Sequence, residues 1–124
     1  MAPVRILSVN HTSLTVREMK PVLAFFMDGL GYELHSLGPR DPAMMSRMTG
    51  IPGVVVTIAF LSAYGHTLEL IHYYAPHERR TLNANLCDAG ATHLAYDVES
   101  MDDAVEMAAG HGFGLAGEVV RVDA

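Results

Sequence analysis

The chain has one cysteine, few basic residues and no long hydrophobic run. The single cysteine, Cys87, cannot form a disulfide within the chain, and we assign it no function. Only 8 Lys and Arg stand against 14 Asp and Glu, for a formal net charge of -6. This balance argues against nucleic acid, because binding phosphates requires clustered cations.

Membrane and secretion signals are also missing from the sequence. No segment approaches the roughly 20 apolar residues that a membrane span needs, and the N-terminus lacks the layout of a signal peptide. Glycine-rich nucleotide motifs, the serine nucleophile motif and paired cysteines are absent as well. We therefore expect a cytoplasmic protein whose partner is a small-molecule substrate. Half of its residues are hydrophobic (50%), which suffices for the core of one domain over residues 1–124.

Two segments of the chain resemble each other, and each opens on a histidine. His11 begins HTSLTVREMKPVLAFFMDGLGY, and His93 begins HLAYDVESMDDAVEMAAGHGF. When the two segments are aligned on their histidines with a gap of one residue, Gly31-Tyr32 aligns with Gly112-Phe113. A duplication that keeps a metal-competent side chain at the same point of both copies predicts two modules facing each other across a shared site.

Hydrophobic periodicity predicts a β-α-β-β-β first module. Alternation and β-branched residues favour a strand over residues 4–16, with His11 near its middle. Helical spacing after Glu18 predicts a helix that ends near Gly29 and Gly31. Further strands are expected at 32–37, 54–62 and 66–74, the last two as a hairpin, while 43–49 is ambiguous between a short helix and a loop.

The second copy reads as β-α-β through Val122, with a capping box at Ser100 and Asp103. We therefore predict an α+β fold in which paired βαβββ modules form a curled, mostly antiparallel sheet around a cleft. The second module is incomplete. The predicted division is 1–76 for the first module, 77–90 for a linker and 91–124 for the partial second module.

Glu69 is the third candidate for a metal ligand. Alternation along its strand places it with Thr67, Ile71 and Tyr73, opposite His72. A carboxylate inside so apolar a strand either faces water or is paired, because burying it alone is costly. Curling of the sheet would bring it toward His11 and His93. Imidazole and carboxylate donors suit a divalent ion such as Zn, Ni, Co, Mn or Fe without selecting one.

Ordinary explanations compete with this site. A lone strand histidine is more often a surface or hydrogen-bonded residue than a ligand, and charged loop residues are usually solvated. We interpret the remaining histidines as surface or structural residues: His35, His66, His72, His77 and His111. Contacts with an anionic substrate would fall to the loop arginines: Arg40, Arg47, Arg79 and Arg80.

Three segments carry a resemblance to the vicinal oxygen chelate superfamily, which includes glyoxalase I, methylmalonyl-CoA epimerase, bleomycin-binding proteins and extradiol dioxygenases. HTSLTV with the helix ending DGLGYEL resembles the family's opening strand, helix and turn. GHTLELIHYYAP resembles its glutamate-bearing strand, and ATHLAYDVESMDDAV resembles the start of its second module. The resemblance implies that His11, Glu69 and His93 are metal ligands and that Glu69 is a ligand or a catalytic base.

The family's fourth ligand, a glutamate on the last strand of the second module, has no match, and Glu118 is a poor substitute. We expect that the sequence is partial. The alternatives are that another chain completes the domain, or that the metal site has three protein ligands. Thr15 stands where glyoxalase I commonly has a glutathione-binding arginine, which argues against a glutathione substrate.

The resemblance implies a metal-dependent lyase or epimerase that moves a proton next to a carbonyl. The alternatives are a metal-free protein that binds a drug or aromatic ligand, and a ring-cleaving dioxygenase. We also expect a homodimer, because an incomplete second module leaves a sheet edge that needs cover.

Overall fold

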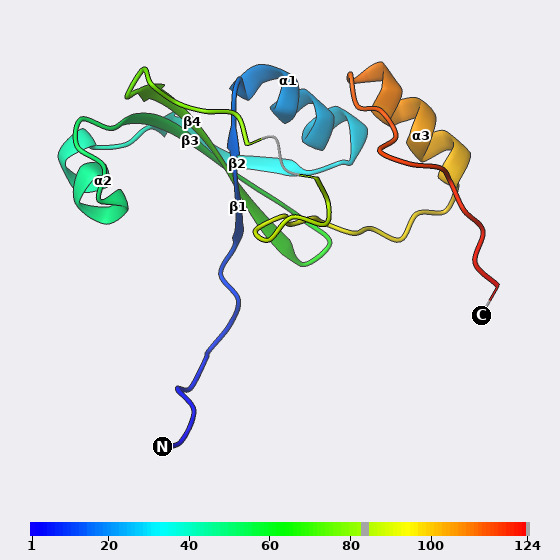
Figure 1. The fold of residues 1–124 in the computed structure, drawn as a ribbon, viewed down its shortest axis with the longest axis horizontal. Helices are drawn as coiled ribbons and strands as arrows, with labels where there is room; N and C mark the ends of the chain where they lie inside the picture. The colour runs from blue at the N-terminus through cyan, green and yellow to red at the C-terminus, as the bar shows by residue number, and fades with distance from the viewer. Residues whose placement is uncertain (83–84, 124) are drawn as a thin grey trace. The chain divides into compact units, whose positions relative to one another are not determined.

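The computed structural model describes residues 1–82 and 85–123, which form two compact units, Met1–Arg80 and Thr81–Ala124. The first unit contains the sheet and most of the helices (Figure 1). Its elements are β1 (Thr12–Val16), α1 (Met19–Ala24), a π-helical turn η1 (Phe25–Gly29), β2 (Glu33–Pro39), α2 (Pro42–Thr49), β3 (Val55–Ala63) and β4 (His66–Ala75). The second unit contains α3 (Met101–Gly110). None of the helices in the described residues has the length and apolar character needed to cross a bilayer.

The four strands form one mixed sheet in the order β1-β4-β3-β2. The β2–β3 and β3–β4 pairs are antiparallel, whereas β1 runs parallel to β4. A parallel neighbour requires a crossover, and the segment from α1 through β3 provides it. The predicted α+β class, the mostly antiparallel sheet and the β-α-β-β-β order of the first module are therefore confirmed.

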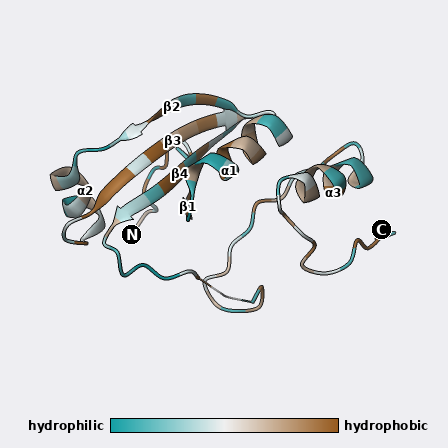
Figure 2. Cartoon of the chain, turned by 90° about the horizontal axis from the view of Figure 1, so that it is seen from above, coloured by the Kyte–Doolittle hydropathy of each residue, from teal (hydrophilic) through white to brown (hydrophobic). Residues whose placement is uncertain are grey.

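Strand β3, which has a largely apolar sequence, is buried on both faces, whereas β4 is buried on one face and half-buried on the other (Figure 2). On one face, Met45 of α2 packs with Val54, Val56 and Ile58. On the other face, Leu61, Leu68 and Leu70 are fully buried on the side where α1 contacts β4. At about 25 cal/mol per Å² of apolar surface removed from water, this double burial is the main stabilising contribution to the sheet. The remainder of the first face carries polar residues and forms the candidate site.

Among the described residues, one predicted strand is shorter than expected and two are missing. The strand expected over 4–16 begins only at Thr12, and His11 precedes it instead of lying near its middle. The second copy has the expected helix, but no strand forms in the described residues on either side of α3. Alternation alone does not make a strand, because the ladder also needs a neighbour to accept and donate its hydrogen bonds. In the part of the chain that the structure describes, residues 4–9 and 93–98 form no strand.

Side-chain caps mark the starts of α2 and α3. Asp41 precedes α2 and accepts a hydrogen bond from the Met44 backbone N–H at 3.1 Å, Pro42 occupies the first helical position, and Gly50 ends the helix with a φ of 72°. The ambiguous segment 43–49 is therefore helical. In α3 the predicted cap is confirmed: Ser100 Oγ accepts from the Asp103 backbone N–H at 3.1 Å.

The β3–β4 hairpin closes through Tyr64 and Gly65, which have φ values of 54° and 71°. Positive φ at both central residues is the type I′ geometry, which matches the twist of paired strands. The turn fixes the register, so that Ala63 pairs with His66 and Phe60 with Glu69.

Gly65→Ala is expected to lower the free energy of unfolding by about 1–2 kcal/mol, because a Cβ is disfavoured in the left-handed region. No atom lies within 4 Å of the added Cβ, so the effect is conformational. Gly38→Ala in β2, where φ is ordinary and space is equally open, is the control. Urea denaturation measures both; equal midpoints for the two variants would show that the turn does not require Gly65.

Candidate functional site

The candidate site is the polar part of one sheet face, and Glu69 lies at its centre. The register pairs Glu69 with Ser13 of β1 on one side and with Phe60 of β3 on the other. Its side chain is only 12% exposed. His72 pairs with Val16 and Thr57 and so belongs to the opposite face, as the alternation predicted.

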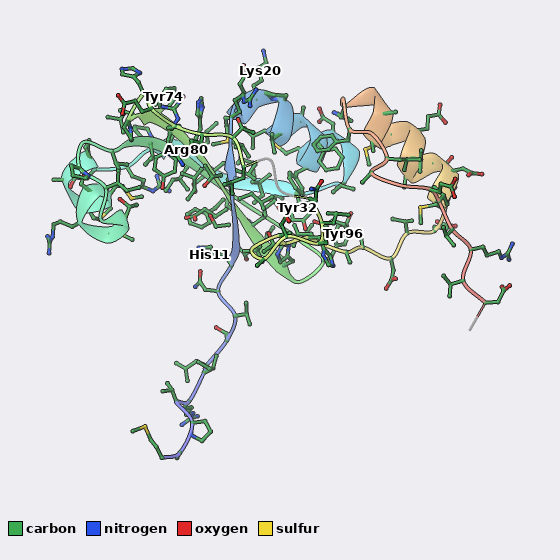
Figure 3. The ribbon with its side chains drawn as sticks, in the orientation of Figure 1. His11, Lys20, Tyr32, Tyr74, Arg80 and Tyr96 are labelled. Carbon is green, nitrogen blue, oxygen red and sulfur yellow. The ribbon has the colours of Figure 1, made fainter. Side chains whose placement is uncertain are left out.

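The partner of Glu69 is His11, which lies at the entry to β1 (Figure 3). His11 Nε2 lies 3.5 Å from Glu69 Oε1, and the His11 side chain is 32% exposed. Glu69, predicted to be paired or to face water, lies largely enclosed beside the His11 imidazole. Two of the three predicted ligands therefore come together within the first unit.

The other ring nitrogen of His11, Nδ1, is hydrogen-bonded to Asn10. His11 Nδ1 lies 2.6 Å from Asn10 Oδ1, and because an amide oxygen can only accept, Nδ1 carries the proton and donates. In the neutral imidazole this leaves a lone pair on Nε2, facing a carboxylate that is also an acceptor. Two acceptors in this position repel each other unless a cation, either a proton on the imidazole or a metal ion, satisfies both.

The spacing of the two donors fits a shared metal ion. Nitrogen and oxygen ligands bound tetrahedrally at about 2.1 Å stand about 3.4 Å apart, and His11 Nε2 and Glu69 Oε1 stand 3.5 Å apart. A ligating histidine also commonly donates its second N–H to a carbonyl, as His11 does to Asn10. In the described residues 1–80 no further His, Cys, Asp or Glu joins the pair to complete a three-ligand group.

Phe60 forms an aromatic wall beside this pair. Its ring centroid lies 5.5 Å from that of His11 in an edge-to-face arrangement with an interplanar angle of 84°. The guanidinium carbon of Arg40 lies 6.0 Å from the same ring centroid. One half-buried aromatic ring thus contacts an imidazole and a guanidinium.

The remaining histidines of the sheet have structural contacts. His66 bridges Tyr32 Oη at 2.9 Å and Thr12 Oγ1 at 3.1 Å, which ties the hairpin to β1. His35 Nε2 is hydrogen-bonded to Ser62 Oγ. The interpretation of His66 and His72 as structural residues agrees with these positions, since neither joins the pair of His11 and Glu69.

His93 lies in the second unit, exposed and outside any strand. Its convergence with His11 and Glu69 stays a prediction. Glu118, the weak substitute for a fourth ligand, is likewise exposed and outside regular structure.

Sequence reasoning missed Asn10, Phe60 and the position of Arg40. Alternation placed Asn10 on the face opposite His11, but the chain before Thr12 is not a strand and its side chains do not alternate. Phe60 could have been found by counting back from a two-residue turn at Tyr64-Gly65, which pairs it with Glu69.

Comparisons with known proteins agree on one family. The family described as Glyoxalase/Bleomycin resistance protein/Dioxygenase superfamily matches residues 8–123. The crystal structure of a glyoxalase family protein from Bacillus cereus is 28% identical, has a TM-score of 0.74, and the alignment covers 99% of this chain and 84% of that one. The structure of SMU.1112c, 21% identical with a TM-score of 0.54 over 87% of this chain and 77% of that one, shares the fold. None of the curated proteins compared matches the chain.

Proposed function

Because the chain belongs to the Glyoxalase/Bleomycin resistance protein/Dioxygenase superfamily, we propose that it is a metal-dependent lyase or epimerase that acts next to a carbonyl of a small molecule. His11, Glu69 and His93 are the proposed ligands of a divalent ion. The observation that supports this proposal is the face-to-face arrangement of His11 Nε2 and Glu69 Oε1 at 3.5 Å, with His11 Nδ1 already engaged by Asn10.

A divalent ion bound here would polarise a substrate carbonyl and make the neighbouring C–H more acidic. The protein's own residues supply the remaining requirements. Glu69 is a carboxylate in a largely enclosed position, so it can accept and return a proton when it is not fully occupied as a ligand. The Phe60 ring excludes water from one side of the pair and offers an apolar surface to the substrate.

Two other activities would use the same surface differently. A metal-free binding protein would hold an aromatic or apolar ligand against Phe60, and the half-exposed ring favours this as the second candidate. A ring-cleaving dioxygenase would need iron and would consume oxygen with catechols. Metal content separates the binding protein from the two enzymes, and oxygen uptake separates the enzymes from each other.

Loss of a ligand is expected to remove the metal. Loss of a residue that only supports a ligand typically lowers metal affinity by about 10–100-fold. His11→Ala and His93→Ala each remove a ligand itself, so each should lower the affinity by more than that. His72→Ala is the matched control. His72 lies on the same strand as Glu69 but on the opposite face of the sheet. Mass spectrometry of metal content after loading and dialysis measures the effect. Unchanged content in both His11→Ala and His93→Ala would rule out the proposed site.

Asn10→Ala is expected to weaken metal binding without abolishing it, by about 10–100-fold, because the amide holds the His11 ring in the tautomer that leaves Nε2 available. Competition with a chelator of known affinity measures the change. Asn10→Asp, which retains an acceptor, should restore most of the affinity. An Asn10→Ala variant that binds metal as tightly as the wild type would contradict the assigned tautomer.

We further propose that the protein is a homodimer. Strand β1 has β4 as its one neighbour in the sheet, so its outer edge leaves backbone groups available for pairing. Val4, Ile6, Leu7 and Val9, just before β1, are between 73% and 89% exposed. Apolar side chains exposed in such a row are typical of an interaction surface. Light scattering should give twice the mass of the chain, 13.4 kDa; a single 13.4 kDa species would contradict the dimer.

A further inference from the structure

Arg40 is unlike the other basic residues of this chain. All 8 Lys and Arg lie in the described residues, and only Arg40 is half-buried, whereas the other seven are exposed. Arginine commonly lays its aliphatic stem along an apolar surface and keeps its charged end in water, so the groups around the Arg40 guanidinium decide what it can bind.

The backbone places Arg40 on the face that carries the site. It follows the end of β2, and its backbone N–H donates to the Val56 carbonyl at 3.3 Å. Its side chain then extends toward Phe60, with the guanidinium carbon 6.0 Å from the ring centroid. Gly38 is paired with Ile58 on the same face, and no atom lies within 4 Å of the position its Cβ would take. The guanidinium therefore contacts the same ring that the His11 imidazole contacts.

No carboxylate of the first unit neutralises Arg40. Its guanidinium donates one long hydrogen bond, 3.4 Å, to the carbonyl of the adjacent Pro39 and forms no ion pair with the described residues. The chain nevertheless carries 14 acidic residues. A guanidinium has five N–H donors in a fork that matches a carboxylate, and most of these donors remain available here.

We propose that the substrate of this site is an organic acid and that Arg40 binds its carboxylate. This inference rests on the proposed function and adds the class of substrate. The reacting carbonyl would lie toward His11 and Glu69, where the divalent ion of the proposed function would bind, and the carboxylate would lie on the Arg40 side of Phe60. The planar fork of the guanidinium matches the two oxygens of a carboxylate. Arg40 is thus a specificity-determining residue.

The test compares an acid with its uncharged counterpart. The probes are 4-oxopentanoate, which carries a carbonyl and a carboxylate, and its methyl ester, with binding followed by calorimetric or NMR titration. The wild type should bind the acid about tenfold more tightly than the ester, as expected for a charge-assisted hydrogen bond. Arg40→Met should abolish this preference and leave ester binding unchanged. Arg40→Lys should retain part of it, because the charge remains and the fork is lost.

Arg47→Met is the matched control, since Arg47 is an exposed arginine of the neighbouring helix α2 and should have no effect. Repeating the titration on His11→Ala separates this inference from the metal site. Loss of the metal with a retained acid preference supports both proposals. Unchanged metal content in the ligand variants overturns the proposed function alone. Equal binding of acid and ester by the wild type, no binding of either, or an acid preference that survives Arg40→Met would overturn the assignment of Arg40.

Discussion

The parallel pairing of β1 with β4 is the constraint on which the site depends. It sets Ser13 beside Glu69, and the chain entering β1 then delivers His11 to the same face. A slip of one residue would exchange the two faces of β1 and move its partly buried Thr12 and Leu14 to the polar side. The burial of Leu68 and Leu70 on the far side opposes such a slip, so the hydrophobic core and the position of His11 are enforced by one register.

Electrostatics then gives this arrangement its chemical meaning. Asn10 Oδ1 lies beside His11 Nδ1 and favours a proton on that nitrogen, and His11 Nε2 faces the Glu69 carboxylate at 3.5 Å. A protein surface normally avoids opposed acceptors, because in a partly desolvated position their repulsion is not screened by water. A cation between the two groups turns this repulsion into attraction. The aromatic ring of Phe60 lies edge-to-face against the His11 imidazole and also faces the guanidinium of Arg40.

Much of the first unit was predictable from sequence because its signals are local. Alternation assigned the faces of Glu69 and His72 correctly, and Ser100 marked the start of α3. The errors arose where strand formation depends on pairing with another segment. In the described residues, 4–9 and 93–98 have the composition of strands but form none, and Asn10 was misplaced because the chain before Thr12 is not a strand. The register of β2 against β3 shifts between Leu34 and Ser36. Hydrophobic periodicity does not predict such a shift, so the position of Arg40 after β2 could not be predicted from the sequence.

The central claim is that His11 Nε2 carries an available lone pair directed at the Glu69 carboxylate, and that a cation binds between these two groups. Its most direct test is the nitrogen chemical shifts of the His11 imidazole in ¹⁵N-labelled protein, followed during titration with Zn²⁺. Nδ1 should remain protonated throughout, and the Nε2 resonance should move as the ion binds. An Nε2 resonance that does not respond to Zn²⁺, or a proton found on Nε2 rather than Nδ1 in the neutral ring, would contradict the account.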